Sequence, residues 1–197
     1  MYLKQEKTYT KIIEKSRFIC YLKHIKTESE YKEYLQSIRK KHYDSSHVCS
    51  AFISDNISRS SDDGEPSGTA GVPILNVLEK NNLNQMCALV VRYFGGIKLG
   101  TGGLSIAYSS TVWECLIDAT LYEDVTYPKY TLTLSYELGN KVEYYLRNNT
   151  ILLDTKYETD VTYIFALDNI NKIDKIIELT KGIKPLQQEN ITIEKIV

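Results

Sequence analysis

The sequence predicts an α+β protein of two domains, residues 1–127 and 128–197. Three observations predict this class. Segments with strand and helix patterns follow one another through the first region, and the pattern changes after Pro128. The chain has 197 residues, enough for one large domain or two small ones. The segments after Pro128 follow the order βαββαβ, which is typical of a ferredoxin-like domain.

The first elements follow from residue type and capping signals. Residues 8–25 are rich in β-branched and aromatic side chains, which predicts two strands with a turn near Glu14–Lys15. Thr27 and Glu30 form a capping box ahead of one apolar helical face. We therefore expect a helix over residues 28–41.

The middle of the chain predicts two strands and two helices. Residues 47–54 and 87–94 indicate strands, and the second is a continuous apolar run that favours a central position, buried on both faces. The stretch VPILNVLEKN predicts a helix with Pro73 in its first turn. Apolar residues at helical spacing predict another helix over residues 104–119.

The second region contains the elements of the expected ferredoxin-like domain. Alternation and helical periodicity predict strands at 130–136, 150–157, 160–167 and 191–197, and helices at 139–148 and 170–177.

Composition indicates a soluble globular protein, with 43% hydrophobic and 25% charged residues. No apolar run reaches about 18 residues, and the segment MYLKQEKTYT does not resemble a signal peptide, so we expect a cytoplasmic location without a membrane partner. The four cysteines have apolar neighbours and no metal-ligand spacing. We expect buried free thiols, no metal and no cofactor.

The charge balance gives no compositional signal for nucleic acid. The formal net charge is −1, and acidic and basic residues nearly balance in both regions. A nucleic-acid surface would therefore need charge segregation on folding. No DNA specificity is expected.

Two motifs concentrate the unusual backbone of the chain. SDDGEPSGTAG spans residues 61–71 and RYFGGIKLGTGG spans residues 92–103. Eight of the ten glycines lie between Gly64 and Gly103. Glycine is common where the backbone takes positive φ or approaches another group closely. The window that contains both motifs is therefore the candidate functional region.

The acidic motif allows two interpretations. Asp62, Asp63 and Glu65 could present carboxylates to a metal, another cation or a basic partner. They could equally accept hydrogen bonds from turn amides and pair with Arg92 or Lys98. Ser67 and Thr69 are candidates to cap the following helix.

The second motif places a glycine-rich turn between a strand and a helix N-terminus, an arrangement that can bind anions. It matches neither a Walker A motif nor GxGxxG. One interpretation is a phosphate cradle assisted by Lys98 and Thr101. The other is a tight crossover in which only glycine fits. His47 is the first residue of the predicted strand 47–54 and is a weaker candidate, without a GxSxG elbow to support a catalytic triad.

The stretches SDDGEPSGTAGVPIL and VVRYFGGIKLGTGGL, with SRFIC and the strand at His47, resemble the YigZ/IMPACT family over nearly the whole chain. The resemblance implies an IMPACT-like N-terminal domain. Its fold would be a β-α-β two-layer sandwich, similar to a ribosomal-protein domain and to the GHMP kinases, and a ferredoxin-like tail would follow. It also implies a role in the regulation of translation. The expected binding residues are Asp62, Asp63, Glu65, Ser67, Thr69, Arg92, Tyr93, Gly95, Gly96, Lys98, Gly100, Thr101, Gly102 and His47.

These observations lead to one main functional hypothesis and two alternatives. The main one is a non-enzymatic binding protein for the ribosome, RNA or translation factors. One alternative is a small-molecule or phosphate-binding enzyme that uses the same two loops, with Asp62, Asp63 and Glu65 holding Mg²⁺ or acting as a base. The other is a protein–protein adaptor that docks through residues 128–197.

Overall fold

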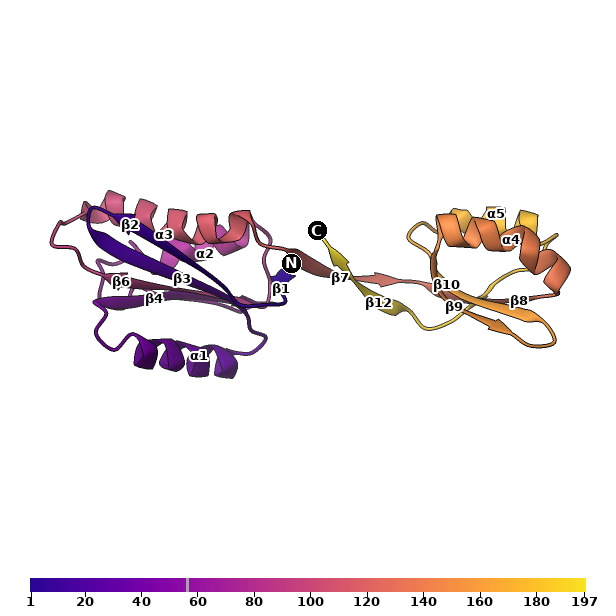
Figure 1. Cartoon of the computed structure of the whole chain (residues 1–197), viewed down its shortest axis with the longest axis horizontal. Helices are drawn as coiled ribbons and strands as arrows, with labels where there is room; N and C mark the ends of the chain where they lie inside the picture. The colour runs from indigo at the N-terminus through magenta and orange to yellow at the C-terminus, as the bar shows by residue number, and fades with distance from the viewer. Residues whose placement is uncertain (56) are drawn as a thin grey trace. The chain divides into compact units, whose positions relative to one another are not determined.

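The computed structural model describes residues 1–55 and 57–197. The chain divides into two compact units, each built from helices and antiparallel sheet (Figure 1). Unit 1 comprises Met1–Glu123 together with Ile196–Val197, and unit 2 comprises Asp124–Lys195. The two-domain α+β class is confirmed.

The elements of unit 1 are β1 (Tyr2–Leu3), β2 (Lys7–Ile13), β3 (Ser16–His24), α1 (Glu28–Lys41), β4 (His47–Ser54), β5 (Ile57–Ser61), α2 (Gly71–Lys80), β6 (Met86–Tyr93) and α3 (Gly100–Ile117). β7 (Leu121–Tyr127) begins in unit 1 and ends in unit 2. The elements that follow are β8 (Lys129–Leu134), α4 (Tyr136–Asn149), β9 (Ile151–Tyr157), β10 (Val161–Ala166), α5 (Lys172–Leu179), β11 (Leu186–Gln187) and β12 (Ile191–Ile196).

Unit 1 is organised around a five-stranded antiparallel sheet in the order β2-β3-β6-β4-β5. β6 is the middle strand, and it is buried along its length except at its last residue, Tyr93. The continuous apolar run therefore forms the buried central strand that the sequence predicts. Its register places Arg92 opposite Phe18 of β3 and His47 of β4.

Helices cover both faces of this sheet (Figure 1). α2 and α3 pack against one face in a core that includes Phe18, Ile74 and Tyr108. α1 packs against the other face, where Tyr34 and Phe52 belong to a second core. Unit 1 thus has three layers rather than the two that were expected. The reason is that β3, β4 and β6 carry apolar side chains on both faces, so both faces need a cover.

Local signals explain the first turn and the first helix. Glu14 and Lys15 join β2 to β3 with φ values of 45° and 63°, the left-handed geometry of a tight hairpin turn. Thr27 accepts a hydrogen bond from the Glu30 amide, and the Glu30 side chain accepts from the Thr27 amide in return. The predicted capping box is present.

Two differences from the predicted elements of unit 1 have plain causes. β5 forms although its sequence, ISRSS, is mostly polar, because it is an exposed edge strand that needs little apolar surface. α3 begins at Gly100 rather than near Leu104. Glycine has a low helix propensity, so the first turn is invisible to periodicity.

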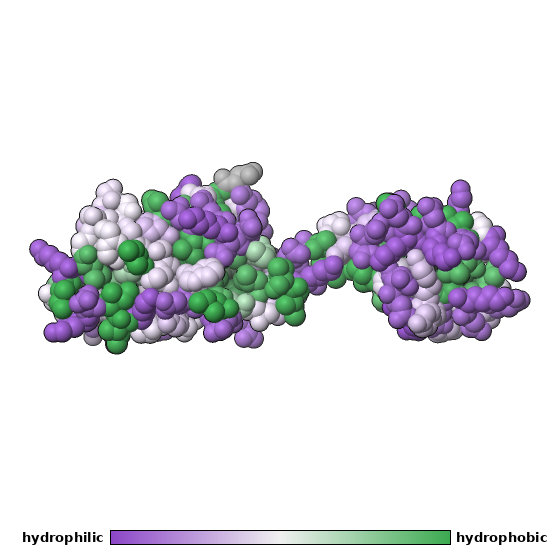
Figure 2. Space-filling model, turned by 90° about the horizontal axis from the view of Figure 1, so that it is seen from above, coloured by the Kyte–Doolittle hydropathy of each residue, from purple (hydrophilic) through white to green (hydrophobic). Residues whose placement is uncertain are grey.

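The outer side of α3 carries exposed apolar side chains. Ile106, Trp113 and Ile117 are 68%, 50% and 60% exposed. Figure 2 views unit 1 from the side of α2 and α3, where hydrophobic residues lie among polar ones.

Unit 2 contains a four-stranded antiparallel sheet in the order β11-β8-β10-β9, with α4 and α5 on one face (Figure 1). This is the strand order of a ferredoxin-like domain, in which the last strand lies beside the first. The prediction that ITIEKIV closes this sheet is wrong, because the segment forms β12, which belongs to another sheet. The two-residue β11 occupies the fourth position, and β12 neighbours β7, where the hydroxyls of Thr126 and Thr192 lie 3.1 Å apart.

Two other features bear on the sequence-based expectations. All four cysteines are buried and free, as predicted, and burial raises the pKa of Cys49 to about 12. Within residues 1–55 and 57–197, no helix is both long and apolar enough to cross a membrane.

Candidate functional site

A cavity of about 330 Å³ lies between the two motifs, and we call it the loop cleft. One wall is the acidic loop, residues 61–71, which joins β5 to α2. The other is the glycine loop, residues 94–103, which leads from β6 into α3. The lining residues are Glu65, Pro66, Arg92, Phe94, Lys98, Leu99, Gly100, Thr101 and Leu104.

The floor of the loop cleft is a buried ion pair. Arg92 Nη1 donates to Glu65 Oε1 at 2.6 Å, and the two side chains are only 6% and 4% exposed. The Tyr108 hydroxyl donates to the same Oε1 at 2.7 Å. Burial raises the pKa of Tyr108, and Cys49 and Glu65 raise it further, so this hydroxyl is a neutral donor. The Glu65 carboxylate is therefore paired with a positive charge and with a hydroxyl donor inside the fold.

Arg92 connects this floor to the rim of the cleft. Its guanidinium lies 5.5 Å from the centre of the Phe94 ring and 5.4 Å from that of Phe18. Its Nη2 lies 3.4 Å from Ser16 Oγ, and its buried Nε has no hydrogen-bond partner among the described residues. An orphaned buried donor is costly unless something else satisfies it.

Asp62 holds the acidic loop together and caps α2. Its Oδ1 accepts hydrogen bonds from the amides of Ala70 and Gly71 at 2.9 and 2.8 Å, and Oδ2 accepts from Gly68 at 2.8 Å. No side chain of the N-cap residue itself, Ala70, caps the helix. The predicted caps are thus corrected: Ser67 is exposed, and Thr69 donates to the carbonyl of Pro66 at 2.6 Å.

Asp62→Ala should lower the stability of unit 1 by about 1–2 kcal/mol at neutral pH, as loss of an N-cap acceptor does. Burial alone would raise the pKa of Asp62, but the amides of Gly68, Gly71 and Ala70 outweigh it and hold the pKa below its ordinary value. This stabilisation is therefore complete above about pH 4 and is lost as the pH falls through the lowered folded-state pKa. Urea unfolding at several pH values should show that the difference in free energy of unfolding between wild type and variant becomes smaller in acid. Asp118→Ala, at an exposed site, should change stability by less than about 0.5 kcal/mol, and a gap that does not vary with pH would contradict the assignment.

Asp63 and His47 fix the acidic loop to the sheet and to α1. Asp63 Oδ2 accepts from the amide of Val48 at 2.6 Å, and Oδ1 pairs with Arg39 of α1. His47 Nδ1 lies 2.7 Å from the Asp63 carbonyl oxygen, and its Nε2 lies 3.9 Å from Glu65 Oε1. Neither Asp63 nor His47 is among the residues that line the loop cleft.

The glycines of the second motif fall into different classes. A Cβ at Gly95 would collide with the backbone of Lys15, so Gly95 allows the glycine loop to pack against the β2–β3 turn. Gly96 and Gly100 have φ values of 86° and 70°, which favour glycine. Gly102 has neither feature: its φ is not positive, and no described atom lies within 4 Å of a Cβ built there. The fold of the described residues gives no reason for glycine at 102.

The rim of the cleft suits an anion beside a flat ring. The side chain of the N-cap residue, Leu99, forms no capping hydrogen bond with any described residue of α3, and the first turn of the helix has no acidic residue, so the amides and the helix dipole favour negative charge. Lys98 lines the same space and is exposed. Phe94, which is 50% exposed, presents an aromatic ring next to these donors. The arrangement can hold a phosphate and stack a base.

The structure brings together only some of the predicted binding residues. Of the predicted set, Glu65, Arg92, Lys98, Gly100 and Thr101 line the loop cleft. Tyr93 points elsewhere: its hydroxyl contacts His42 Nδ1 at 2.8 Å and Asp44 at 3.2 Å, with Arg17 over its ring. The sequence analysis missed Phe94, Pro66, Leu99, Leu104 and Tyr108. The position of Phe94 next to the glycines was the one available signal.

The described residues offer no ready metal centre. Within residues 1–55 and 57–197, no group of three or more His, Cys, Asp or Glu side chains is placed to hold a metal ion. The carboxylates of the acidic loop instead bind amides and cations of the fold, largely as the second interpretation of this motif expected. Glu65 pairs with Arg92, whereas Asp63 pairs with Arg39 rather than with Lys98.

Comparisons with known proteins give consistent matches. The family model of the Impact N-terminal domain matches residues 14–116. The IMPACT family member YvyE of Bacillus subtilis (strain 168) is 41% identical over 194 residues, which cover 94% of this chain and 89% of that protein. The IMPACT family member YigZ of Escherichia coli (strain K12) is 39% identical over 141 residues, 69% of each protein. A crystal structure of a hypothetical protein aligns over 98% of this chain and 95% of its own, with 30% identity and a TM-score of 0.61.

Proposed function

The chain belongs to the IMPACT family, and from this premise we propose that it is a non-enzymatic, cytoplasmic binding protein in the regulation of translation. We propose further that it binds single-stranded RNA of the ribosome in the loop cleft. The link to translation rests on the family resemblance. The choice of RNA rests on the chemistry of the cleft.

One observation carries the proposal: an exposed aromatic ring lies beside an uncapped, glycine-rich helix N-terminus. Phe94 offers a face on which a base can stack, a contact typical of proteins that bind single strands. The amides at Gly100 and Thr101, with the Lys98 ammonium, offer donors for a phosphate. A nucleotide unit needs both features close together.

The charge balance fits a small, local contact. A chain with a formal net charge of −1 carries no overall excess of positive charge to attract a duplex backbone, so we propose that its affinity comes from a few placed groups and from stacking. Lys15 adds a further exposed cation near this site, since its backbone packs against Gly95. An unpaired RNA segment fits these conditions better than a duplex.

The state of the carboxylates supports binding rather than catalysis. A general base needs a carboxylate that can reach a substrate proton. Glu65 is the carboxylate that lines the cleft among the described residues, and it is buried between Arg92 and Tyr108. Asp62 and Asp63 are occupied by amides of the fold and by Arg39.

The test is co-sedimentation of the full chain with ribosomes across a salt series, for wild type and for Lys98→Ala. Loss of one phosphate contact should weaken binding and reduce the slope of log affinity against log salt by about 0.7 to 1. Lys80→Ala is the matched control, because Lys80 is also an exposed lysine and lies at the far end of α2. It should leave the slope unchanged.

Equal slopes for the two variants, or no association at all, would overturn the RNA proposal. In that case melting temperatures with nucleotides and Mg²⁺ would test the small-molecule alternative. Saturable binding to the native state raises the melting temperature.

A further inference from the structure

A group of cations lies at the end of the five-stranded sheet where β6 leads into the glycine loop. The C-terminal end of α1 lies at this same end of the sheet (Figure 1). The amide of Ser46 donates to the Arg92 carbonyl at 2.9 Å, and the Phe94 amide donates to Ser46 Oγ at 3.0 Å. Arg17, the second residue of β3, lies opposite Tyr93 of β6 in the sheet. This end of the sheet therefore borders the loop cleft, since Phe94 directly follows Tyr93.

Arg17 is positioned by the ring of Tyr93. Its guanidinium carbon lies 4.3 Å from the centre of that ring, within the range of a cation–π contact. Tyr93 is itself fixed, because its hydroxyl lies 2.8 Å from His42 Nδ1 and donates to Asp44 Oδ1 at 3.2 Å. Arg17 is exposed and, among the described residues, forms no ion pair with a carboxylate. A guanidinium has five N–H donors, so contact with Tyr93 leaves others for a ligand.

Lys41, the last residue of α1, supplies a second charge beside Arg17. Its ammonium lies 4.8 Å from the centre of the Tyr21 ring, and the Tyr21 hydroxyl lies 2.7 Å from His42 Nε2. Burial lowers the pKa of His42, and the charges of Lys41 and Arg17 lower it further. Asp44 acts in the opposite direction without reversing the shift. The two cations therefore lie near one imidazole ring, which is neutral at pH 7.

Positive charge exceeds negative charge around the start of β3 and the end of α1. Arg39 of the last turn of α1 is used by its ion pair with Asp63. The exposed charged residues here that form no ion pair within the described part of the chain are mostly cations: Lys15, Arg17, Lys40 and Lys41, against Glu14 and Asp44. A chain with a formal net charge of −1 needs such segregation to bind a nucleic acid.

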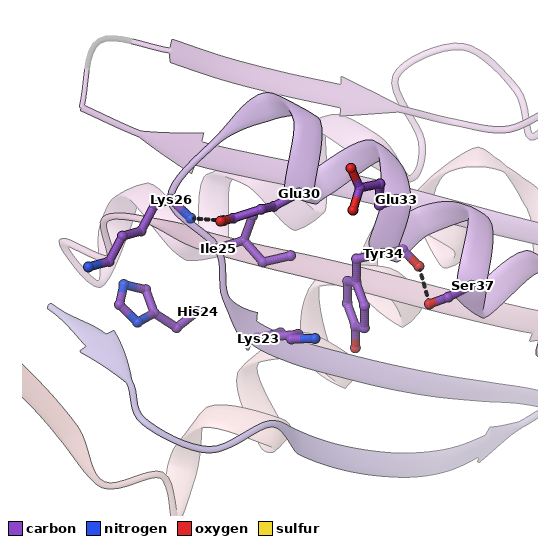
Figure 3. A pocket seen from close by; sticks show the side chains of 8 residues that line it. All are labelled: Lys23, His24, Ile25, Lys26, Glu30, Glu33, Tyr34 and Ser37. Carbon is purple, nitrogen blue, oxygen red and sulfur yellow. Dashed lines mark hydrogen bonds between the residues drawn. The ribbon is translucent and has the colours of Figure 1, made fainter.

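The other end of α1 and β3 has no such excess. Figure 3 shows the cavity of about 470 Å³ that lies there. Its charged lining residues are two lysines and two glutamates: Lys23, Lys26, Glu30 and Glu33. Burial raises the pKa of Tyr34 in this cavity, and the nearby Glu6 carboxylate raises it further. Carboxylates thus outnumber ammonium groups at that end, and the cationic surface is confined to the end that carries the glycine loop.

We propose that RNA bound in the loop cleft continues around the end of the sheet, where Arg17 and Lys41 each contact one of its phosphates. The inference rests on the function proposed above and adds a second contact region for the same ligand. Neighbouring residues of a strand point to opposite faces of a sheet. Arg92 and the loop cleft therefore lie on one face, and Tyr93 with Arg17 on the other. A single strand can follow this turn, whereas a stiff duplex cannot.

The experiment measures binding of the full chain to a fluorescein-labelled oligouridylate of about twelve nucleotides, by fluorescence anisotropy across a salt series. Arg17→Ala and Lys41→Ala should each reduce the slope of log affinity against log salt by about 0.7, the value of one phosphate contact on a single strand. Arg17→Lys keeps the charge and should keep the slope. Lys32→Ala is the matched control, because Lys32 lies in the same helix, is 65% exposed and pairs with Glu28.

Lys98→Ala in the same series distinguishes this inference from the function proposed for the loop cleft. If Lys98→Ala reduces the slope but Arg17→Ala and Lys41→Ala do not, the inference is overturned and the loop cleft keeps its role. If Arg17→Ala and Lys41→Ala reduce the slope but Lys98→Ala does not, phosphate binding by Arg17 and Lys41 is supported and the role of the loop cleft is contradicted. No binding of the oligouridylate by wild type overturns both. The melting temperatures of all variants should match that of wild type, because each replaced side chain is exposed.

Discussion

Arg92→Ala is expected to destabilise unit 1 by about 3–5 kcal/mol, the cost of removing one partner from a buried ion pair. The Glu65 side chain is 4% exposed in the wild-type protein, and removal of Arg92 leaves the Tyr108 hydroxyl as its remaining described donor within hydrogen-bond distance. Urea unfolding measures the loss directly.

Arg59→Ala is the matched control for this prediction. Arg59 pairs with Glu28 at 3.4 Å, but the arginine side chain is 52% exposed. Such surface pairs contribute about 0–1 kcal/mol, so the two arginine variants should differ clearly. Replacing both Arg92 and Glu65 by apolar residues should recover much of the loss, because no charge is then left buried. Similar costs for Arg92→Ala and Arg59→Ala would show that the pair is not buried as described.

This expectation decides how the site can be probed. Arg92 resembles a ligand-binding arginine in sequence, but its variants would lose binding through loss of the fold. Lys98 and Gly102 are better probes, since Lys98 is exposed and a Cβ at Gly102 meets no described atom.

Gly102→Ala should raise the stability of the protein and weaken its binding to RNA. Glycine inside a helix costs about 0.5–1 kcal/mol relative to alanine. Gly102 lies in the first turn of α3 with ordinary φ and open space around it, so alanine should raise the melting temperature. The added methyl group would lie where a phosphate must approach the amides, so RNA affinity should fall by roughly tenfold, which corresponds to about 1.4 kcal/mol.

Gly100→Ala provides the contrast for this measurement. Gly100 has a φ of 70°, so alanine there should lower the melting temperature rather than raise it. Differential scanning calorimetry and ribosome co-sedimentation of the three proteins give both readouts. A Gly102→Ala variant that is more stable and binds as well as wild type would remove the ligand-based explanation for this glycine.

Local sequence signals predicted most of the fold because they act within one element. The capping box at Thr27, the turn at Glu14–Lys15 and the apolar run of β6 each depend on neighbouring residues. The partner of β12 was not predictable in this way. The segment ITIEKIV has strand periodicity, but its pairing with β7 depends on contacts between residues far apart in the chain.

The site was predictable as a region but not in its internal roles. Motif density placed the functional window at two glycine-rich loops, and a cavity does lie between them. Sequence could not reveal that Glu65 is buried against Arg92, or that Asp62 reaches the amides at 68–71. Those roles depend on the direction in which each side chain leaves its loop, which is fixed by the packing of α2 and α3. Phe94 was missed because an aromatic residue after a buried strand is usually part of the core.

The most direct test of RNA binding in the loop cleft is ultraviolet cross-linking of the full chain bound to ribosomes, followed by mass spectrometry of tryptic peptides. Cleavage after Arg92 and Lys98 isolates the peptide YFGGIK, residues 93–98. We predict that this peptide carries a cross-linked nucleotide and that Phe94→Leu abolishes the cross-link while the variant remains folded. Cross-links found only in other peptides, or retained at residues 93–98 in Phe94→Leu, would contradict stacking of RNA on Phe94.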